Sequence, residues 1–347
     1  MKFEPPQTGA YNRVPGRAEA ITPPQFPRSS KLDPQSPRRS RGLDNLENHG
    51  EIRTTTDQRR TAECPAAPPP TRRDQTHLRI LFVADIYARP GRRAAAECIP
   101  RLIQERAVDL CIANGENAAG GFGMTDNIIK KLHAYGVDVV TSGNHIWNRA
   151  DFVRHIGQHQ RVLRPFNYPK GAPGRGSVIA EDRSGRSVAV INLQGRTFMP
   201  DIDCPFQQGR AEVERLRDET PLVFVDFHAE ATAEKIALGF HLDGLASAVI
   251  GTHTHVQTAD ERILPKGTAF LTDAGMTGVR DSVIGTRHEV AVGRFVNQVP
   301  ARFKPADGVP YFSGALVEID ETTGKALAIE RLQIPVESGG ADAGDED

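Results

Sequence analysis

The chain has 347 residues and a formal net charge of −1 at pH 7. Its length allows one large domain or two smaller ones, and the balanced charge gives no general attraction toward nucleic acid or an anionic membrane. The long apolar runs are of strand length, well short of the ~20 residues that a membrane-spanning helix needs. The chain opens without a basic segment followed by an apolar core, so we expect no secretory signal and no membrane partner.

The first 77 residues differ in composition from the rest of the chain. They contain 12 of the 25 prolines and many Arg, Ser, Thr and Gln residues, with few aliphatic clusters. Such a segment buries too little apolar area to offset its ordering entropy, so we predict a disordered extension over 1–77. Interspersed acids argue against a transit peptide or a nucleic-acid arm, and a start codon assigned too far upstream is the alternative.

From residue 78 onward, short apolar runs alternate with segments of helical periodicity, which is typical of an α/β domain. The run at 78–84 is nearly continuous, as expected of a parallel strand buried on both faces. We place the globular domain at 78–336 and a frayed acidic tail at 337–347. The predicted strands are 78–84, 110–113, 137–141, 188–193, 222–227, 246–250 and 269–272; the helices are 91–107, 125–135 (N-cap Thr125), 150–156 and 231–242; a hairpin joins 311–320 to 325–334.

The four cysteines, Cys64, Cys98, Cys111 and Cys204, lie without CxxC spacing. Cys98 falls in a predicted helix and Cys111 in a predicted strand. Free, buried thiols in a reducing compartment are the expected state of these two residues. We therefore predict a cytoplasmic protein.

Polar side chains follow five of the predicted strands at the point where each strand ends. They are Asp85, the pair Glu116-Asn117, the pair Asn144-His145 after Gly143, His228, and the alternating His253 and His255 of a GTHTH run. Ligands of open α/β sheets gather at the carboxyl ends of the strands, so we expect these side chains to converge. If the backbone stays extended at GTHTH, both of its histidines project to one side.

Each cluster taken alone has an ordinary structural interpretation. A single Asp after a strand is usually a helix cap or turn residue, and Asp85 precedes a predicted Arg89–Gly91 turn. A lone GNH is as often a turn as a site, and Glu116 could belong to a plain polar turn. The GTHTH run is harder to dismiss, because two histidines together rarely serve only packing. The occurrence of all five clusters at strand ends favours a functional site.

The combined donor set suits divalent metals. Carboxylates, amide oxygens and imidazoles are ligands for iron, manganese or zinc, and a Glu carboxylate such as Glu116 can bridge two cations. Asp226 shares a side with His228 and is a candidate supporting residue. His145 stands beside the proposed metals, and an imidazole can donate a proton to a leaving alkoxide. Two metals roughly 3.5 Å apart would clamp an in-line displacement at phosphorus and generate hydroxide at neutral pH.

Three other features have no clear link to this site. The remaining globular histidines (His77, His133, His155, His159, His241 and His288) have no partner at ligand spacing, so structural roles are expected. The glycine-rich run 120–123 lacks a P-loop ending and is interpreted as a mobile loop beside the site. Segment 164–169 offers either a phosphate-facing Arg164 with a stacking aromatic or a plain structural turn.

These residues resemble the calcineurin-like metallophosphoesterases. The resemblance runs from about Leu78 to Ile334 and is carried by Asp85, NGEN (114–117), GNH (143–145), INLQGRTF (191–198), DFHAE (226–230), GTHTHVQTAD (251–260), RILPKGTAF (262–270) and TDAGMTG (272–278). Tyr87 stands where the superfamily usually has His, and Glu116 replaces its bridging Asp. Both departures are similar to the YmdB-type branch, described as 2′,3′-cyclic-nucleotide phosphodiesterases.

The resemblance implies a four-layer α/β/β/α sandwich with two metal ions, most often iron, with manganese or zinc as alternatives. His145 would be the proton donor. The implied ligands are Asp85, Glu116, Asn117 and His255 for one ion, and Glu116, Asn144, His228 and His253 for the other.

We therefore expect a metal-dependent phosphodiesterase acting on a small cyclic nucleotide or a similar phosphodiester. The alternative from another class is a regulatory, nucleotide-sensing scaffold protein with a metal site and little turnover; the presence of His145 favours turnover. A nuclease would need a basic groove that the near-neutral charge does not indicate, so no nucleic-acid partner is expected. A homo-oligomer is compatible with the sequence.

Overall fold

The structure, a computed structural model, describes residues 77–336. The predicted 1–77 extension, apart from His77, and the predicted 337–347 tail lie outside the described residues. His77 opens the first strand, one residue before the predicted start.

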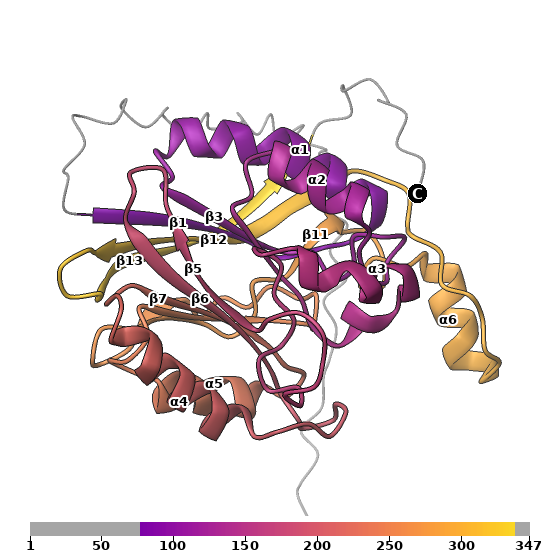
Figure 1. Ribbon diagram of the computed structural model, residues 1–347. Helices are drawn as coiled ribbons and strands as arrows, with labels where there is room; N and C mark the ends of the chain where they lie inside the picture. Colours follow the sequence, from indigo (N-terminus) through magenta and orange to yellow (C-terminus); the bar gives the residue numbers. More distant parts are fainter. Residues whose placement is uncertain (1–76, 337–347) are drawn as a thin grey trace, which may run out of the picture. The chain divides into compact units, whose positions relative to one another are not determined.

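Two mixed sheets face each other in the described domain (Figure 1). In both sheets, neighbouring strands are often distant in sequence, which is the mark of crossover connections. The first has the order β2 (Asp85–Ile86), β11 (Met276–Val279), β12 (Pro310–Asp320), β1 (His77–Val83), β3 (Leu110–Asn114), β4 (Val139–Thr141), with β13 (Ala326–Pro335) paired to β12. The second has the order β5 (Ser177–Glu181), β6 (Ser187–Gln194), β7 (Val223–His228), β8 (Ala248–Thr252), β10 (Ala269–Leu271), β9 (Arg262–Ile263).

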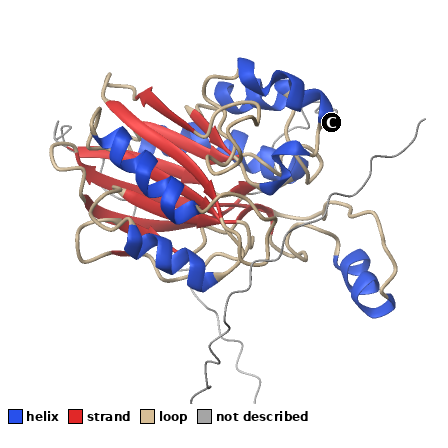
Figure 2. Ribbon diagram, turned by 60° about the horizontal axis from the view of Figure 1, so that its bottom comes forward, coloured by secondary structure: helices blue, strands red, loops and turns tan. Residues whose placement is uncertain are grey.

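Helices cover the outer face of each sheet (Figure 1). The first sheet is covered by α1 (Ala88–Glu105) and α2 (Asp126–Ala134), with α3 (Ala150–His155) and the short 3₁₀ helices η1 (Asn144–Trp147) and η2 (Ile156–Gln158) beside them. The second sheet is covered by α4 (Pro205–Arg217) and α5 (Thr232–His241). Helix α6 (His288–Asn297) projects away from the layers (Figure 2). The fold is a four-layer α/β/β/α sandwich, as the resemblance implied.

The burial of strand β1 explains why residues 80–83 are all apolar. Leu81 and Val83 belong to the core between the first sheet and its helices, whereas Ile80 and Phe82 belong to the core between the two sheets. Alternate residues of a strand point to opposite faces, so a strand with a core on each side needs apolar residues at every position. A third core lies between the second sheet and helices α4 and α5.

The strand registers bring the site-bearing ends together. Strands β1, β3 and β4 are parallel neighbours, with Val83 beside Ala113 and Asn114 beside Thr141. In the other sheet, β7 and β8 are parallel, with His228 beside Thr252. The residues that follow these carboxyl ends therefore meet at one edge of the sandwich.

Helix α1 corrects one prediction. It begins at Ala88 rather than at 91, so the segment Arg89–Gly91 lies in its first turn, where proline is tolerated, instead of forming a separate turn. Gly91 is required by space, because a Cβ there would lie 2.3 Å from the carbonyl oxygen of Thr277 in β11. The predicted N-cap of α2 is confirmed: Thr125 Oγ1 accepts a hydrogen bond from the Ile128 amide at 3.3 Å.

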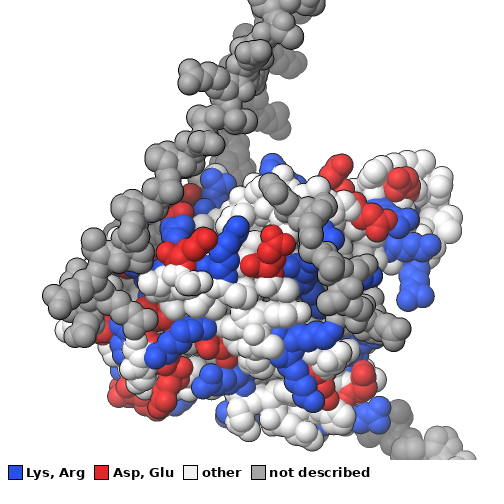
Figure 3. All heavy atoms as spheres, turned by 90° about the horizontal axis from the view of Figure 1, so that it is seen from above, with Lys and Arg blue, Asp and Glu red and all other residues white. Residues whose placement is uncertain are grey.

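The predictions about the cysteines, the surface charge and membrane-spanning helices can be compared with the described residues. Cys98 in α1 and Cys111 in β3 are buried and have free thiols, as predicted. On the face formed by α1 and α2, Lys and Arg are interspersed with Asp and Glu (Figure 3). Within residues 77–336, no helix combines the length and the apolar character needed to cross a membrane.

Candidate metal centre

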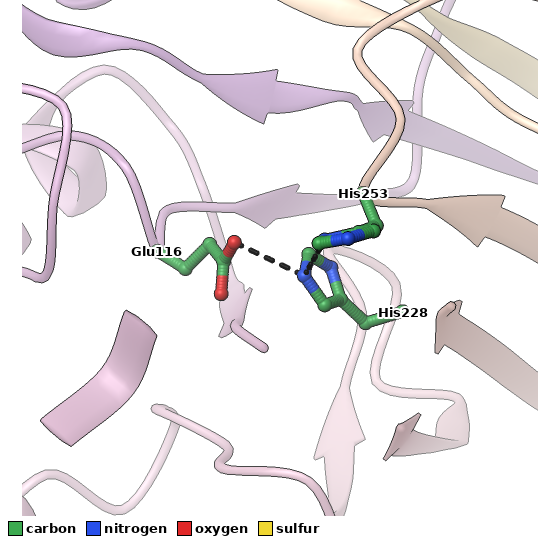
Figure 4. A group of neighbouring side chains, drawn as sticks. All are labelled: Glu116, His228 and His253. Carbon is green, nitrogen blue, oxygen red and sulfur yellow. Dashed lines mark hydrogen bonds and ion pairs between the residues drawn. The ribbon is translucent and has the colours of Figure 1, made fainter. Parts of the chain in front are cut away.

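His228 lies at the centre of a buried cluster formed by the strand ends. Its Nε2 atom is 3.0 Å from Glu116 Oε1, 3.1 Å from Asn144 Oδ1 and 3.0 Å from His253 Nδ1. Figure 4 shows Glu116 and the two imidazoles pointing toward one another. Metal–ligand bonds of about 2.1 Å that meet at right angles leave neighbouring ligand atoms about 3 Å apart. The distances from His228 Nε2 to these three atoms are therefore those expected between neighbouring ligands of one ion, and Glu116, His228 and His253 are grouped closely enough to hold one.

Each of the three clustered imidazoles has an acceptor or hydroxyl at its outward nitrogen. His255 Nδ1 lies 3.0 Å from the Ile284 carbonyl oxygen, which can only accept, and His253 Nε2 lies 3.1 Å from a Glu230 carboxylate oxygen. His228 Nδ1 lies 3.0 Å from Thr252 Oγ1. In the neutral ring, donation from the outward nitrogen fixes the tautomer and leaves the lone pair of the other nitrogen facing inward, which is the usual state of metal-bound histidine.

Asp226 determines the direction of the hydrogen bond at His228. Thr252 Oγ1 donates to Asp226 Oδ1 at 2.7 Å, so its lone pair must accept from His228 Nδ1–H. The other carboxylate oxygen of Asp226 accepts from Thr141 Oγ1 at 2.5 Å and from Asn114 Nδ2 at 3.0 Å. Asp226 thus supports His228 through Thr252, in the supporting role predicted for it.

The second half of the cluster contains Asp85, Asn117 and His255. Asn117 Nδ2 is 3.1 Å from His255 Nε2 and 3.2 Å from Glu116 Oε1, and His255 Nε2 is 3.9 Å from Asp85 Oδ1. The amide nitrogen of Asn117, rather than the predicted carbonyl oxygen, faces the cluster; a half-turn of the amide exchanges the two. Asp85 Oδ1 is buried and has no hydrogen-bond partner, which fits a carboxylate oxygen placed to bind a cation.

The charges of the cluster shift its pKa values in different directions. Burial raises the pKa of Asp85 well above its usual range, against the opposing effect of His228. Burial also favours neutral Glu116, but the adjacent His228 outweighs it and lowers the Glu116 pKa to about 2. Burial lowers the pKa of His228, yet Glu116 and the neighbouring carboxylates raise it to about 9. Protons thus balance the buried carboxylates without a cation, and a bound metal would replace the proton on His228 Nε2.

The backbone of the GTHTH run differs from the prediction. His253 and His255 have φ angles of +103° and +64°, so the chain is not extended there. Their side chains reach the cluster because the backbone turns through the left-handed region at both residues. That region is uncommon for residues other than glycine.

Gly143 is needed for space rather than for a turn. Its φ of −161° is extended backbone that any residue can adopt. A Cβ at this position would lie 2.1 Å from His228 Cδ2, inside the imidazole ring's contact distance. The glycine of the GNH run therefore admits the His228 ring beside Asn144.

His145 lies at the rim of the cluster, in η1. Its backbone amide donates to Glu116 Oε2 at 3.0 Å, which ties the residue to the centre. Its ring packs edge-on against Phe122, with 4.9 Å between centroids. Phe122 belongs to the glycine-rich run 120–123, which therefore lies beside the site as predicted.

Segment 164–169, Tyr87 and the remaining histidines have structural contacts. Arg164 is buried and donates to the carbonyl oxygens of Pro165 and Phe166. Segment 164–169 is therefore a structural turn, and Arg164 does not face a phosphate site. Tyr87, which replaces the superfamily histidine, packs edge-on against the His255 ring with 5.7 Å between centroids. The other histidines contact residues outside the cluster: Glu318 (His77), Val137 (His133), Asp126 (His155 and His159), Phe206 (His241) and Glu289 (His288).

Several residues that support the cluster were not predicted. Thr141 and Thr252 end their strands as ordinary β-branched residues, and Glu230 lies two residues beyond His228. The only sequence signal for Glu230 is its place in the DFHAE run.

A cavity of about 440 Å³ opens beside His255, and its walls include Met276, Arg280, Ile284 and Tyr311.

Comparison with known proteins places this chain in a family. The model of the YmdB-like protein family matches residues 81–332. A Bacillus subtilis (strain 168) protein named 2′,3′-cyclic-nucleotide 2′-phosphodiesterase is 47% identical over 257 residues, which cover 74% of this chain and 97% of that protein.

Two solved structures are also similar. A hypothetical protein from Thermus thermophilus is 40% identical, with a TM-score of 0.70 over 74% of this chain and 99% of its own. A phosphatase from Mycoplasma pneumoniae is 31% identical, with a TM-score of 0.70 over 75% and 94%. By sequence and fold together, the chain belongs to the YmdB-like family.

Proposed function

We propose that this protein is a metal-dependent phosphodiesterase that hydrolyses 2′,3′-cyclic nucleotides or similar phosphodiesters. The observation that carries the proposal is the orientation of His228, His253 and His255. Each has a hydroxyl, carboxylate or carbonyl oxygen beside its outward nitrogen and directs its other nitrogen into the buried cluster, where His228 Nε2 lies 3.0 Å from Glu116 Oε1. The substrate class is suggested by the name of the Bacillus subtilis relative.

The donor set divides between two ions that share Glu116. One group contains Asp85, Asn117 and His255, and the other contains Asn144, His228 and His253. We propose iron for both, with manganese or zinc as alternatives. When bound, such ions supply Lewis acidity toward the phosphate and a lowered pKa for water.

The remaining chemistry is assigned to the chain's own residues. His145 would donate a proton to the leaving ribose oxygen, because it stands at the rim and is linked through its backbone to Glu116. The cavity beside His255 has the size of a small-molecule site and offers Arg280 and Tyr311 to the organic part of the substrate.

The test combines metal analysis with hydrolysis of a small panel by the full-length protein. The panel contains 2′,3′-cAMP, 3′,5′-cAMP, bis-p-nitrophenyl phosphate and a phosphate monoester. We expect two metal ions per chain and a preference for 2′,3′-cAMP. His253→Ala and Glu116→Ala should each lower the metal content and abolish hydrolysis.

His288→Ala is the matched control, because this histidine is 65% exposed and lies on α6 outside the cluster. Wild-type metal content and turnover in both cluster variants would contradict the dinuclear assignment. Bound metal without turnover of any diester would instead favour the nucleotide-sensing alternative.

A further inference from the structure

The backbone turn at His253, Thr254 and His255 is strained, so other residues must hold it in place. Two non-glycine residues with positive φ, separated only by Thr254, form a backbone that few sequences adopt without being held. Their inward nitrogens nevertheless approach the cluster closely: His253 Nδ1 is 3.0 Å from His228 Nε2 and His255 Nε2 is 3.1 Å from Asn117 Nδ2. Within the cluster, Asp85 Oδ2 accepts a hydrogen bond from the His253 amide at 3.3 Å, and the further contacts to Thr254 come from outside the cluster.

Asp273 supplies these contacts. It follows β10 and is 1% exposed. Its Oδ2 atom accepts hydrogen bonds from both the amide and the hydroxyl of Thr254, at 3.1 and 2.8 Å, and its Oδ1 atom accepts from the Gly275 amide at 2.8 Å. Asp273 thus holds the middle residue of the turn through both its amide and its hydroxyl.

Lys235 joins this arrangement from helix α5. Its side chain is 1% exposed and its ammonium group donates to Asp273 Oδ2 at 2.5 Å, so the carboxylate charge is balanced inside the fold. Gly251 makes room for the pair: a Cβ there would lie 1.8 Å from the Thr272 carbonyl oxygen and 3.1 Å from Lys235 Cδ. The glycine of the GTHTH run therefore serves the approach of Lys235 and the 272–273 segment.

We infer that Asp273, balanced by Lys235, is a positioning residue that holds Thr254 so that His253 and His255 present their inward nitrogens to the metals. The inference rests on the proposed function in one respect, that the two histidines are metal ligands. A buried ion pair with a purely structural role would stabilise the fold without altering metal affinity. When the hydrogen bonds to Thr254 are weakened, a positioning role predicts a loss of metal affinity, whereas a purely structural role predicts a loss of stability alone.

The sharpest variant is Thr254→Val, which removes the hydroxyl and keeps both the shape and the amide. Thr254→Ser is its matched control, because it keeps the hydroxyl. Affinity for Mn²⁺ is measured by chelator competition on metal-stripped, full-length protein, with the melting temperature of each metal-free variant recorded beside it. Loss of a contact that orients ligands typically costs about 10- to 100-fold in metal affinity. We expect that loss for Thr254→Val and near-wild-type affinity for Thr254→Ser.

A second variant covers the case in which Thr254→Val does not fold. Lys235→Met combined with Asp273→Ala removes the hydrogen bonds to Thr254 without leaving a buried charge unpaired. It should weaken Mn²⁺ binding at least as much as Thr254→Val. Wild-type Mn²⁺ affinity in either folded variant, with only a lowered melting temperature, would overturn the inference.

The outcome is separable from that of the proposed function. If the wild type binds Mn²⁺ and Thr254→Val weakens the binding, the positioning role stands even when no cyclic nucleotide is hydrolysed. A wild type that binds none of Fe²⁺, Mn²⁺ and Zn²⁺ overturns the positioning role together with the metal centre.

Discussion

Gly143→Ala should damage the centre although it adds only one methyl group. The new Cβ would lie 2.1, 2.3 and 2.4 Å from Cδ2, Nε2 and Cγ of His228. Non-bonded carbons prefer about 3.5–4.0 Å, so the ring or the backbone must move by roughly 1.4 Å. The ring cannot retreat freely, because its Nδ1 is held by Thr252. A misplacement of about 1 Å costs on the order of 10²-fold in activity, and overpacking costs about 1–3 kcal/mol of stability.

The assay compares metal content, hydrolysis of 2′,3′-cAMP and denaturant unfolding of Gly143→Ala with those of Gly157→Ala. Gly157 is the matched control, because no neighbouring atom lies within 4 Å of the Cβ that alanine would add. We expect lost metal and lost turnover in Gly143→Ala and almost no change in Gly157→Ala. If Gly143→Ala keeps wild-type metal affinity and activity, the placement of the His228 ring against Gly143 is wrong.

Three further predictions follow from the same geometry. His145→Ala should keep its metals and slow cleavage from a ribose oxygen by ~10²–10⁴-fold, with a much smaller loss for a p-nitrophenolate leaving group; equal losses at equal metal content would remove its role as proton donor. Thr252→Val should weaken metal binding about 10- to 100-fold and Thr252→Ser should restore it, as measured by chelator competition. In the metal-free fold, the carboxylates around His228 overcome the effect of burial and raise its pKa from 6.5 to about 9. The stability that comes from protonated His228 is therefore complete below pH 6.5 and is lost as pH rises through 9, a fall on the order of 1–3 kcal/mol. Urea unfolding of chelator-treated protein across that range measures it, and a flat profile would contradict the shift.

The strands that carry the centre were predictable from local pattern. Cores on both faces of β1 make residues 80–84 apolar without interruption, so the polar residue that follows them, Asp85, stands out. Polar residues likewise end or follow the apolar runs of β3, β4, β7 and β8. Parallel neighbours must end at a common edge, so the convergence of these residues follows from strand order.

The elements that were not predicted lack such a pattern. Helix α4 buries only Pro205, Gly209, Glu212, Val213 and Leu216, so its apolar stripe is thin and includes a carboxylate. Helix α6 buries Ala291 alone among its residues. Strand β11 is short and pairs with β12 and β2, which lie far away in the sequence, whereas β5 forms a local antiparallel pair with β6.

The error at GTHTH has a more specific cause. Extended alternation was the natural local prediction, but the turn at Thr254 depends on Asp273, which lies 19 residues later, and on Lys235, which lies 19 residues earlier. Neither carries a local signal of its role.

The protonation pattern of the three imidazoles also depends on residues that are distant in the sequence. A sequence shows that histidines are present at strand ends, but not which nitrogen of each ring carries the proton. That choice is made by Thr252 at the end of β8, Glu230 after β7 and the carbonyl oxygen of Ile284 before α6. The carbonyl contact could come from any residue type, so no side chain at 284 would reveal it. A donor set can therefore be predicted from its residues, whereas its orientation depends on the assembled fold.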